Sequence, residues 1–177
     1  PDLMAAFRAA IADAAADRAL RAVVLTGRGP SFCAGADCRT ASPVPGDAPA
    51  DTAALPDYER LYATYEPFLE VFDLPMPVIA AMNGHAVGGG FGLALVCDLR
   101  IATREARYGA NFARLGFHSG MAISHLLPRI VGVPLAADLL FTGRLVTGEE
   151  AAAIGLVHEA VAAEEVLAAA HAKARAI

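Results

Sequence analysis

The sequence is poor in charge, and its cations do not cluster. Only 19% of the 177 residues are charged, and 14 Lys and Arg against 19 Asp and Glu give a net charge of −5. Because no run of basic residues occurs, the sequence does not indicate a surface for nucleic acid or for an anionic membrane. We expect the partner to be a small molecule or another subunit.

Long apolar runs are also missing. Glycines interrupt the apolar segment 86–96, and Asp98 ends it, so it falls short of the roughly 20 residues that a membrane-spanning helix needs. The first residues lack the basic and apolar regions of a secretory signal peptide. The sequence therefore predicts a soluble protein without a membrane partner.

Cysteine is scarce, and its spacing fits neither a disulfide framework nor a zinc site. The three cysteines, Cys33, Cys38 and Cys97, form an odd set without a CxxC pair. No other cluster of metal-ligating residues is apparent, so no metal is expected. We expect a reducing compartment, most simply the cytoplasm.

What the sequence does have is apolar residues, at 56% of the chain, which suffice for one domain with a substantial core. Strands and helices alternate in its first part, which predicts an α/β fold with a largely buried sheet. Strands are expected at 22–26, 78–82 and 99–103, with an edge strand at 107–109. Helices are expected at 3–20, 55–73 with a kink at Pro67, 90–96, 122–131, 135–142, 148–154 and from 163 onward, and a surface excursion at 39–54.

The most informative segment is the glycine run 88–90, which lies between an apolar strand and an apolar helix. A helix that begins there points unpaired N–H groups, at the positive end of its dipole, toward an oxyanion or a polarised carbonyl. A second glycine-containing loop, 33–37, follows the preceding strand. If the two strands are neighbours, one N–H from each loop can stabilise the same oxygen. The alternative is that these glycines serve only tight turns and close packing.

Several segments together resemble the crotonase family, the enoyl-CoA hydratase/isomerase superfamily. They occur in the family's order along nearly the whole chain, and they are AVVLTG at 22–27, FCAGAD at 32–37, PVIAAMNGHAVGGG at 77–90, CD at 97–98, LLPRIVG at 126–132, FTG at 141–143 and AAIGLV at 152–157. The family's opening strands and closing helices are absent from the sequence.

The resemblance implies a fold, a ligand and a set of site residues. The fold would be the crotonase spiral of ββα units with C-terminal helices, and the ligand an acyl-CoA thioester, so that CoA belongs to the substrate and no separate cofactor is needed. The oxyanion-hole amides fall on Ala36 and Gly89. Further substrate contacts fall on Ala34, Asp37, Gly88 and Phe112. Members of the family assemble as trimers or hexamers, which is expected here by analogy.

The sequence departs from the family at its acids. Hydratases of this family use two glutamates, and the matching positions here are Gly92 and Phe112, neither of which can transfer a proton. His118, on the later loop, is our first substitute for acid–base work, and His85 is a weaker one. Both have the alternative of simple backbone hydrogen bonding.

Other carboxylates are less specific. On the expected helix 55–73, Glu59 is a further candidate, and Tyr62, Glu66 and Glu70 share one face that is interpreted as solvated. Asp37 and Asp98 are interpreted as carboxylates that bond nearby backbone N–H groups.

Three functions remain open at this point. The first is an enzyme of enoyl-CoA hydratase/isomerase type that polarises a thioester carbonyl. The second is a noncatalytic acyl-CoA-binding protein. The third is a decarboxylase of the same family, because decarboxylation needs little acid–base help beyond the oxyanion hole.

Overall fold

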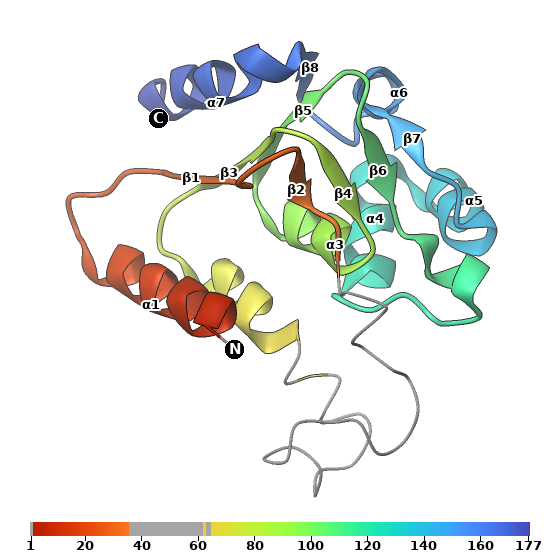
Figure 1. Ribbon diagram of the computed structural model, residues 1–177, viewed down its shortest axis with the longest axis horizontal. Helices are drawn as coiled ribbons and strands as arrows, with labels where there is room; N and C mark the ends of the chain where they lie inside the picture. The colour runs from red at the N-terminus through yellow and green to blue at the C-terminus, as the bar shows by residue number, and fades with distance from the viewer. Residues whose placement is uncertain (1, 36–61, 63–64) are drawn as a thin grey trace, which may run out of the picture.

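Two four-stranded sheets organise the molecule. The computed structural model describes residues 2–35, 62 and 65–177. The first sheet has the order β1-β3-β5-β8 and the second β2-β4-β6-β7 (Figure 1). The bounds in the first sheet are Val23–Thr26, Val78–Met82, Leu99–Thr103 and Glu159–Val161, and in the second Ser31–Cys33, His85–Val87, Arg107–Gly109 and Val146–Thr147.

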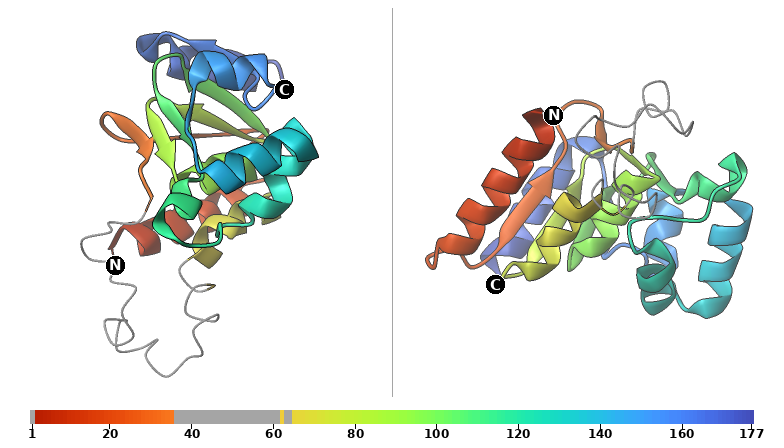
Figure 2. Two further views of the ribbon diagram at one scale, coloured as in Figure 1. Left: turned by 90° about the vertical axis from the view of Figure 1, so that its right-hand side faces the viewer. Right: turned by 90° about the horizontal axis from the view of Figure 1, so that it is seen from below.

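The chain alternates between the sheets, placing one strand in the first and the next in the second. It does so three times, with β1 and β2, β3 and β4, and β5 and β6. Every pairing in the first sheet is parallel, and in the second only β6 with β7 is antiparallel. Equivalent strands of successive turns therefore lie side by side, and the chain path is a spiral (Figure 2).

Helices cover the sheets from several sides. α7 contacts β1, β3 and β5, whereas α3 contacts β2 and β4 of the second sheet as well as α4. Figure 1 shows α7 and the α4–α5 pair on opposite sides of the molecule. The helices are α1 (Asp2–Ala16), α3 (Gly89–Val96), α4 (Ile123–Val131), α5 (Val133–Thr142), α6 (Gly148–Ala153) and α7 (Val166–Arg175), with 3-10 turns η1 (Glu70–Asp73), η2 (Asn111–Leu115) and η3 (Ala163–Glu165).

The core explains why these segments fold as they do. β3 is buried at all five positions, as expected for a central parallel strand, and α3 is buried from Gly90 to Val96. A main cluster packs around α3, and a smaller one joins Ile79 and Ile101 to Val166 and Ala170 of α7. None of the helices in the described ranges is both long and apolar enough to cross a membrane.

Most expected elements are confirmed within a few residues. β1, β3, β5 and β6 occupy the predicted segments, and helices occur at 2–16, 89–96, 123–131, 133–142, 148–153 and 166–175. The expected helix 55–73 is described only in part: Tyr62 and 65–69 are α-helical, and the chain tightens into η1 at Glu70 without leaving a helical path at Pro67. The expected excursion 39–54 lies outside the described residues.

Three expectations about strands are wrong. The segment 27–37, interpreted as a loop, contains β2, and the glycine turn after β3 contains β4. β6 is not an edge strand, because it pairs with both β4 and β7. These strands of two or three residues are too short to show an alternating pattern, so sequence periodicity does not reveal the second sheet.

Candidate active site

The two glycine-containing loops meet in space. β2 pairs in parallel with β4, with Cys33 opposite Ala86, so the loops that follow them leave the same edge of the second sheet. A Cβ atom built on Gly35 would lie 3.5 Å from the Gly89 nitrogen and 2.9 Å from the Val87 oxygen. The loop that leads into residue 36 therefore runs directly against the start of α3.

The start of α3 has the backbone geometry of an anion site. Gly88 caps the helix with φ 59°, its N–H donates to the Gly109 carbonyl at 3.0 Å, and its carbonyl accepts the Gly92 N–H at 3.1 Å. Within the described ranges no carbonyl accepts the Gly89 or Gly90 N–H. Among the residues that the structure describes, the Gly89 N–H is therefore a donor without an acceptor at the positive end of the helix dipole.

Close packing fixes α3 against β2. A Cβ atom on Gly90 would lie 2.0 Å from the Cys33 carbonyl oxygen, so only glycine lets the helix approach the strand this closely. This contact sets the distance between the helix start and the loop after Cys33. Close packing is therefore confirmed for Gly90, and the oxyanion site stays a prediction for Gly89.

The space beside Gly92, where the resemblance predicts a family glutamate, is filled by other side chains. A Cβ atom on Gly92 would lie 2.3 Å from the Met121 Cβ and 3.2 Å from Cγ1 of Ile123. Met121 is 2% exposed, and both it and Ala122 have left-handed backbones, with φ of 55° and 53°. The bend at 121–122 thus presses the Met121 side chain onto the helix where a side chain of residue 92 would begin.

Three further side chains surround the start of α3. The Asn111 Oδ1 would lie 3.5 Å from a Cβ on Gly88, and the Phe112 ring 3.8 Å from the same point. The Tyr65 ring would lie 3.4 Å from a Cβ on Gly89. The predicted contact residues Gly88 and Phe112 are therefore neighbours, and the surroundings of the Gly89 donor are largely aromatic.

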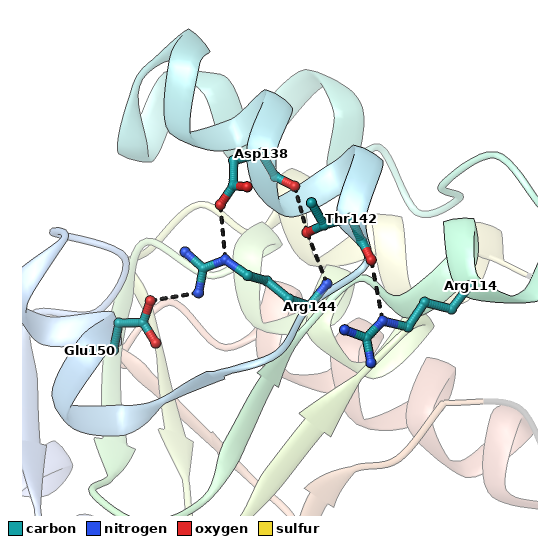
Figure 3. Close-up of polar contacts among 5 residues, drawn as sticks. All are labelled: Arg114, Asp138, Thr142, Arg144 and Glu150. Carbon is teal, nitrogen blue, oxygen red and sulfur yellow. Dashed lines mark hydrogen bonds and ion pairs between the residues drawn. The ribbon is translucent and has the colours of Figure 1, made fainter.

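Polar contacts hold η2, which carries Asn111 and Phe112, against α5. Arg114 Nε donates to the Thr142 carbonyl at 3.2 Å, and the Thr142 hydroxyl donates to the Asp138 carbonyl at 2.7 Å (Figure 3). Arg144 bridges Asp138 and Glu150 at 2.8 and 2.6 Å, which joins α5 to α6. Figure 3 shows these groups as a chain of contacts from η2 to α6.

The other predicted site residues are placed unevenly. Ala36 and Asp37 lie outside the described residues, so their roles stay predictions. Ala34 is exposed just after β2, and His118 is exposed between η2 and α4. His85 accepts the Arg107 N–H through Nδ1 at 2.9 Å, which is the simple backbone role considered for it.

The carboxylates of the helix at 65–73 serve an ion pair. Arg8 of α1 contacts Glu66 at 2.6 Å and Glu70 at 2.9 Å, and Tyr62 is 58% exposed. Glu59 lies outside the described residues. Asp98 accepts the Val78 N–H through Oδ2 at 2.8 Å, so its anchoring role is confirmed.

Sequence reasoning missed Tyr65 and Met121 as neighbours of the helix start. Tyr65 is partly buried, and burial raises the pKa of its hydroxyl. Its helical spacing with Phe68 signalled burial without saying against which loop. The contact of Met121 with Gly92 has no sequence signal, because a methionine in a loop is normally read as core.

Known proteins with similar sequences share one description. The chain matches the family model described as Enoyl-CoA hydratase/isomerase over residues 1–177. It is 42% identical over 158 residues to a putative enoyl-CoA hydratase of Thermus thermophilus, covering 89% of this chain and 60% of that protein. It is 40% identical over 169 residues to a probable enoyl-CoA hydratase of Mycobacterium tuberculosis, covering 94% and 58%.

Solved structures with similar sequences have the same fold as this chain. A probable enoyl-CoA hydratase/isomerase from Mycobacterium abscessus matches with a TM-score of 0.81 and 39% identity, over 98% of this chain and 64% of that one. An enoyl-CoA hydratase from Bacillus anthracis matches with a TM-score of 0.84 and 32% identity, over 98% and 65%. The fold is thus the crotonase fold, and the chain spans about three fifths of the length of these curated relatives.

Proposed function

The chain belongs to the enoyl-CoA hydratase/isomerase family, and from that premise we propose that it binds an acyl-CoA thioester and polarises the thioester carbonyl with the backbone N–H groups of Ala36 and Gly89. One observation carries the proposal: Gly35 lies against the Gly89 nitrogen, which has no acceptor in the described part of the chain. Two such donors stabilise the charge that develops on the oxygen by several kcal/mol, typically about 3 each.

The reaction is of enoyl-CoA hydratase/isomerase type, with an unusual source of protons. Gly92 has no side chain, and Met121 fills the space where one would begin. Phe112 offers a ring beside Gly88 in place of a carboxylate. Ordinary hydration with two glutamates is therefore not available to this site, and His118, exposed on the neighbouring loop, stays our candidate for proton transfer.

A second candidate function is decarboxylation of a malonyl-type CoA ester. The observation that favours it is the apolar lining by Phe112 and Met121, because a carboxylate loses hydration there while the amides stabilise the enolate that forms. A noncatalytic acyl-CoA-binding protein would have the same two backbone amides and would catalyse neither the hydratase/isomerase reaction nor decarboxylation.

The remaining parts of the proposal follow the family. CoA is part of the substrate, and no separate cofactor or metal takes part. Ala34 and Asp37 border the CoA moiety, and Gly88 and Phe112 border the acyl group. We propose one domain, a homotrimer or hexamer, and a cytoplasmic location, with no nucleic acid or membrane as partner.

Two substitutions at Gly89 test the carbonyl site. Gly89→Pro removes the N–H at the first position of α3, where helices tolerate proline, and Gly89→Ala keeps it. A Cβ here would lie 3.4 Å from the Tyr65 ring, an ordinary contact distance, so Gly89→Ala is a matched control. Binding of crotonyl-CoA is measured by calorimetry, and the thioester carbonyl stretch by infrared difference spectroscopy.

The expected result is a lowered carbonyl frequency with the unmodified protein and Gly89→Ala, and its return toward the solution value with Gly89→Pro. Any turnover, followed as loss of enoyl absorbance or release of carbon dioxide, should fall about 100-fold or more with Gly89→Pro. Equal frequencies in the two variants would mean that Gly89 does not contact the carbonyl.

A further inference from the structure

Tyr65 lies between the start of α3 and the bend at 120–122. Its Cε1 would lie 3.4 Å from a Cβ on Gly89, and its hydroxyl oxygen 2.9 Å from a Cβ on Gly120. The ring thus extends from the start of α3 to the bend that contains Met121. Glycine at 120 is what lets the hydroxyl end of the ring come this close to the backbone.

The helix that carries Tyr65 is held from its other side. Arg8 of α1 contacts Glu66 and Glu70, and Phe7 meets Phe68 edge to face with ring centroids 5.5 Å apart. These contacts occupy the residues that follow Tyr65 and leave its ring directed at Gly89. α1 therefore helps to position Tyr65 through these contacts.

The hydroxyl of Tyr65 lies beside the place of the missing acid. Gly120, which it approaches, directly precedes Met121, and the Met121 Cβ covers Gly92. The phenol therefore lies against the residue that precedes Met121, and Met121 covers the space where a side chain at 92 would begin. That space lies one helical turn beyond the Gly89 donor.

The Tyr65 hydroxyl is suited to donate a hydrogen bond. Burial raises the pKa of the Tyr65 hydroxyl above its ordinary value, so it stays protonated at neutral pH. A neutral phenol donates one hydrogen bond and accepts from others, so the half-buried Tyr65 hydroxyl can donate to an oxygen beside it.

We infer that Tyr65 contacts the bound acyl group, and that its hydroxyl donates a hydrogen bond to an oxygen on the β-carbon. The inference rests on the proposed function, which places the thioester oxygen at the Gly89 amide. The acyl chain then runs along the first turn of α3 toward residues 92 and 121. Its class of substrate is an acyl-CoA that carries or gains an oxygen at the β-position.

The test compares two ligands and three forms of the full chain. Dissociation constants of butyryl-CoA and 3-hydroxybutyryl-CoA, which differ only by the β-oxygen, are measured by calorimetry. Tyr65→Phe keeps the ring and removes the hydroxyl. Tyr62→Phe is the matched control, because Tyr62 lies on the same helical segment and is exposed.

Tyr65→Phe should raise the dissociation constant of 3-hydroxybutyryl-CoA about five- to tenfold and leave that of butyryl-CoA unchanged, as expected for the loss of one neutral hydrogen bond. Tyr62→Phe should change neither constant. If Tyr65→Phe weakens both esters equally, or neither, Tyr65 does not contact the β-oxygen and the inference is wrong. If the unmodified chain binds neither ester, the proposed function itself fails, and this inference with it.

A second variant guards against loss of folding in Tyr65→Phe. A Cβ on Gly120 would lie 2.7 Å from the Tyr65 Cε2, so Gly120→Ala displaces the ring while keeping its hydroxyl. The same ligand-selective loss is expected. Thermal unfolding of each variant shows whether a change in binding reflects the site, and a Gly120→Ala protein that is folded and binds both esters normally would overturn the inference.

Discussion

Substitution of Gly92 by alanine tests whether Met121 really fills the position of the missing acid. The added Cβ would lie 2.3 Å from the Met121 Cβ, whereas carbon atoms in contact prefer about 3.5–4.0 Å. Both atoms are fixed directly to backbone, so no rotamer change separates them. Either α3 or the bend at 121–122 must move.

The expected cost follows from these distances. Overpacking of a core typically costs about 1–3 kcal/mol, and the fixed geometry here places Gly92→Ala near the upper end. Replacing a helical glycine by alanine by itself stabilises the folded protein by about 1 kcal/mol, which leaves about 2 kcal/mol of net destabilisation. For a chain of this size that lowers the unfolding midpoint by roughly 4–8 °C.

The assay is a double-mutant cycle followed by thermal or urea unfolding. Met121→Gly removes the opposing Cβ and also relieves the left-handed backbone, although it loses a buried side chain and costs about 2–4 kcal/mol alone. In that background Gly92→Ala should stabilise the protein by about 1 kcal/mol, because only the gain in helix propensity is left, which gives a coupling of about 3 kcal/mol. Gly89→Ala on the same helix should stay within about 0.5 kcal/mol of the unmodified protein. The reasoning is refuted if Gly92→Ala is as stable as Gly89→Ala, or costs the same in both backgrounds.

Four further outcomes are expected. Ala122→Gly should raise the free energy of unfolding by about 0.5 kcal/mol in urea melts, because relief of φ 53° outweighs the added freedom of the unfolded chain, and a lower stability would contradict the assigned strain. Iodoacetamide at pH 8 should label Cys33 and spare Cys97, because burial raises the pKa of the Cys97 thiol to about 12. Peptide mass spectrometry measures the labelling of each cysteine, and faster labelling of Cys97 would contradict this prediction. Burial also raises the pKa of Tyr108 from 10.0 to about 12. Because the folded state holds the phenol proton more tightly, the stability that this proton contributes is complete below pH 10 and is lost between pH 10 and 12. Tyr108→Phe should therefore remove this contribution to the fall of stability at alkaline pH. Arg144→Met should cost only about 1 kcal/mol, and less in 1 M salt, because its ion pairs with Asp138 and Glu150 are partly exposed; a salt-independent loss would point to packing instead.

The sequence predicts three of the four strands of the first sheet, and the helices, because their signals are local. β3 is a run of five apolar residues, β5 has five residues of which all but Leu99 are buried, and α3 begins at a glycine cap. The second sheet leaves no such signal, since β2 and β4 have only three residues each. Their pairing depends on the spiral path, which brings residues about 50 positions apart into register.

The candidate site divides in the same way. Gly88, Gly89 and Phe112 can be located from motifs, because a helix start and a neighbouring loop are encoded in short segments. The occupation of the space at Gly92 depends on the backbone of Met121 and Ala122, and left-handed φ values at non-glycine residues are not apparent from residue type. Tyr65 likewise reaches the site only through the packing of its helix against α1.

The contact between Met121 and Gly92 also bears on how this lineage can change. A glutamate at 92 would be harmful while the methionine bend stays in place, and a small residue at 121 would be harmful while position 92 stays bare, because it would leave a void against the helix. Each of these single replacements is therefore expected to be selected against through its effect on folding. A carboxylate can be introduced at position 92 only together with a smaller residue at 121, so the two positions are expected to vary as a pair.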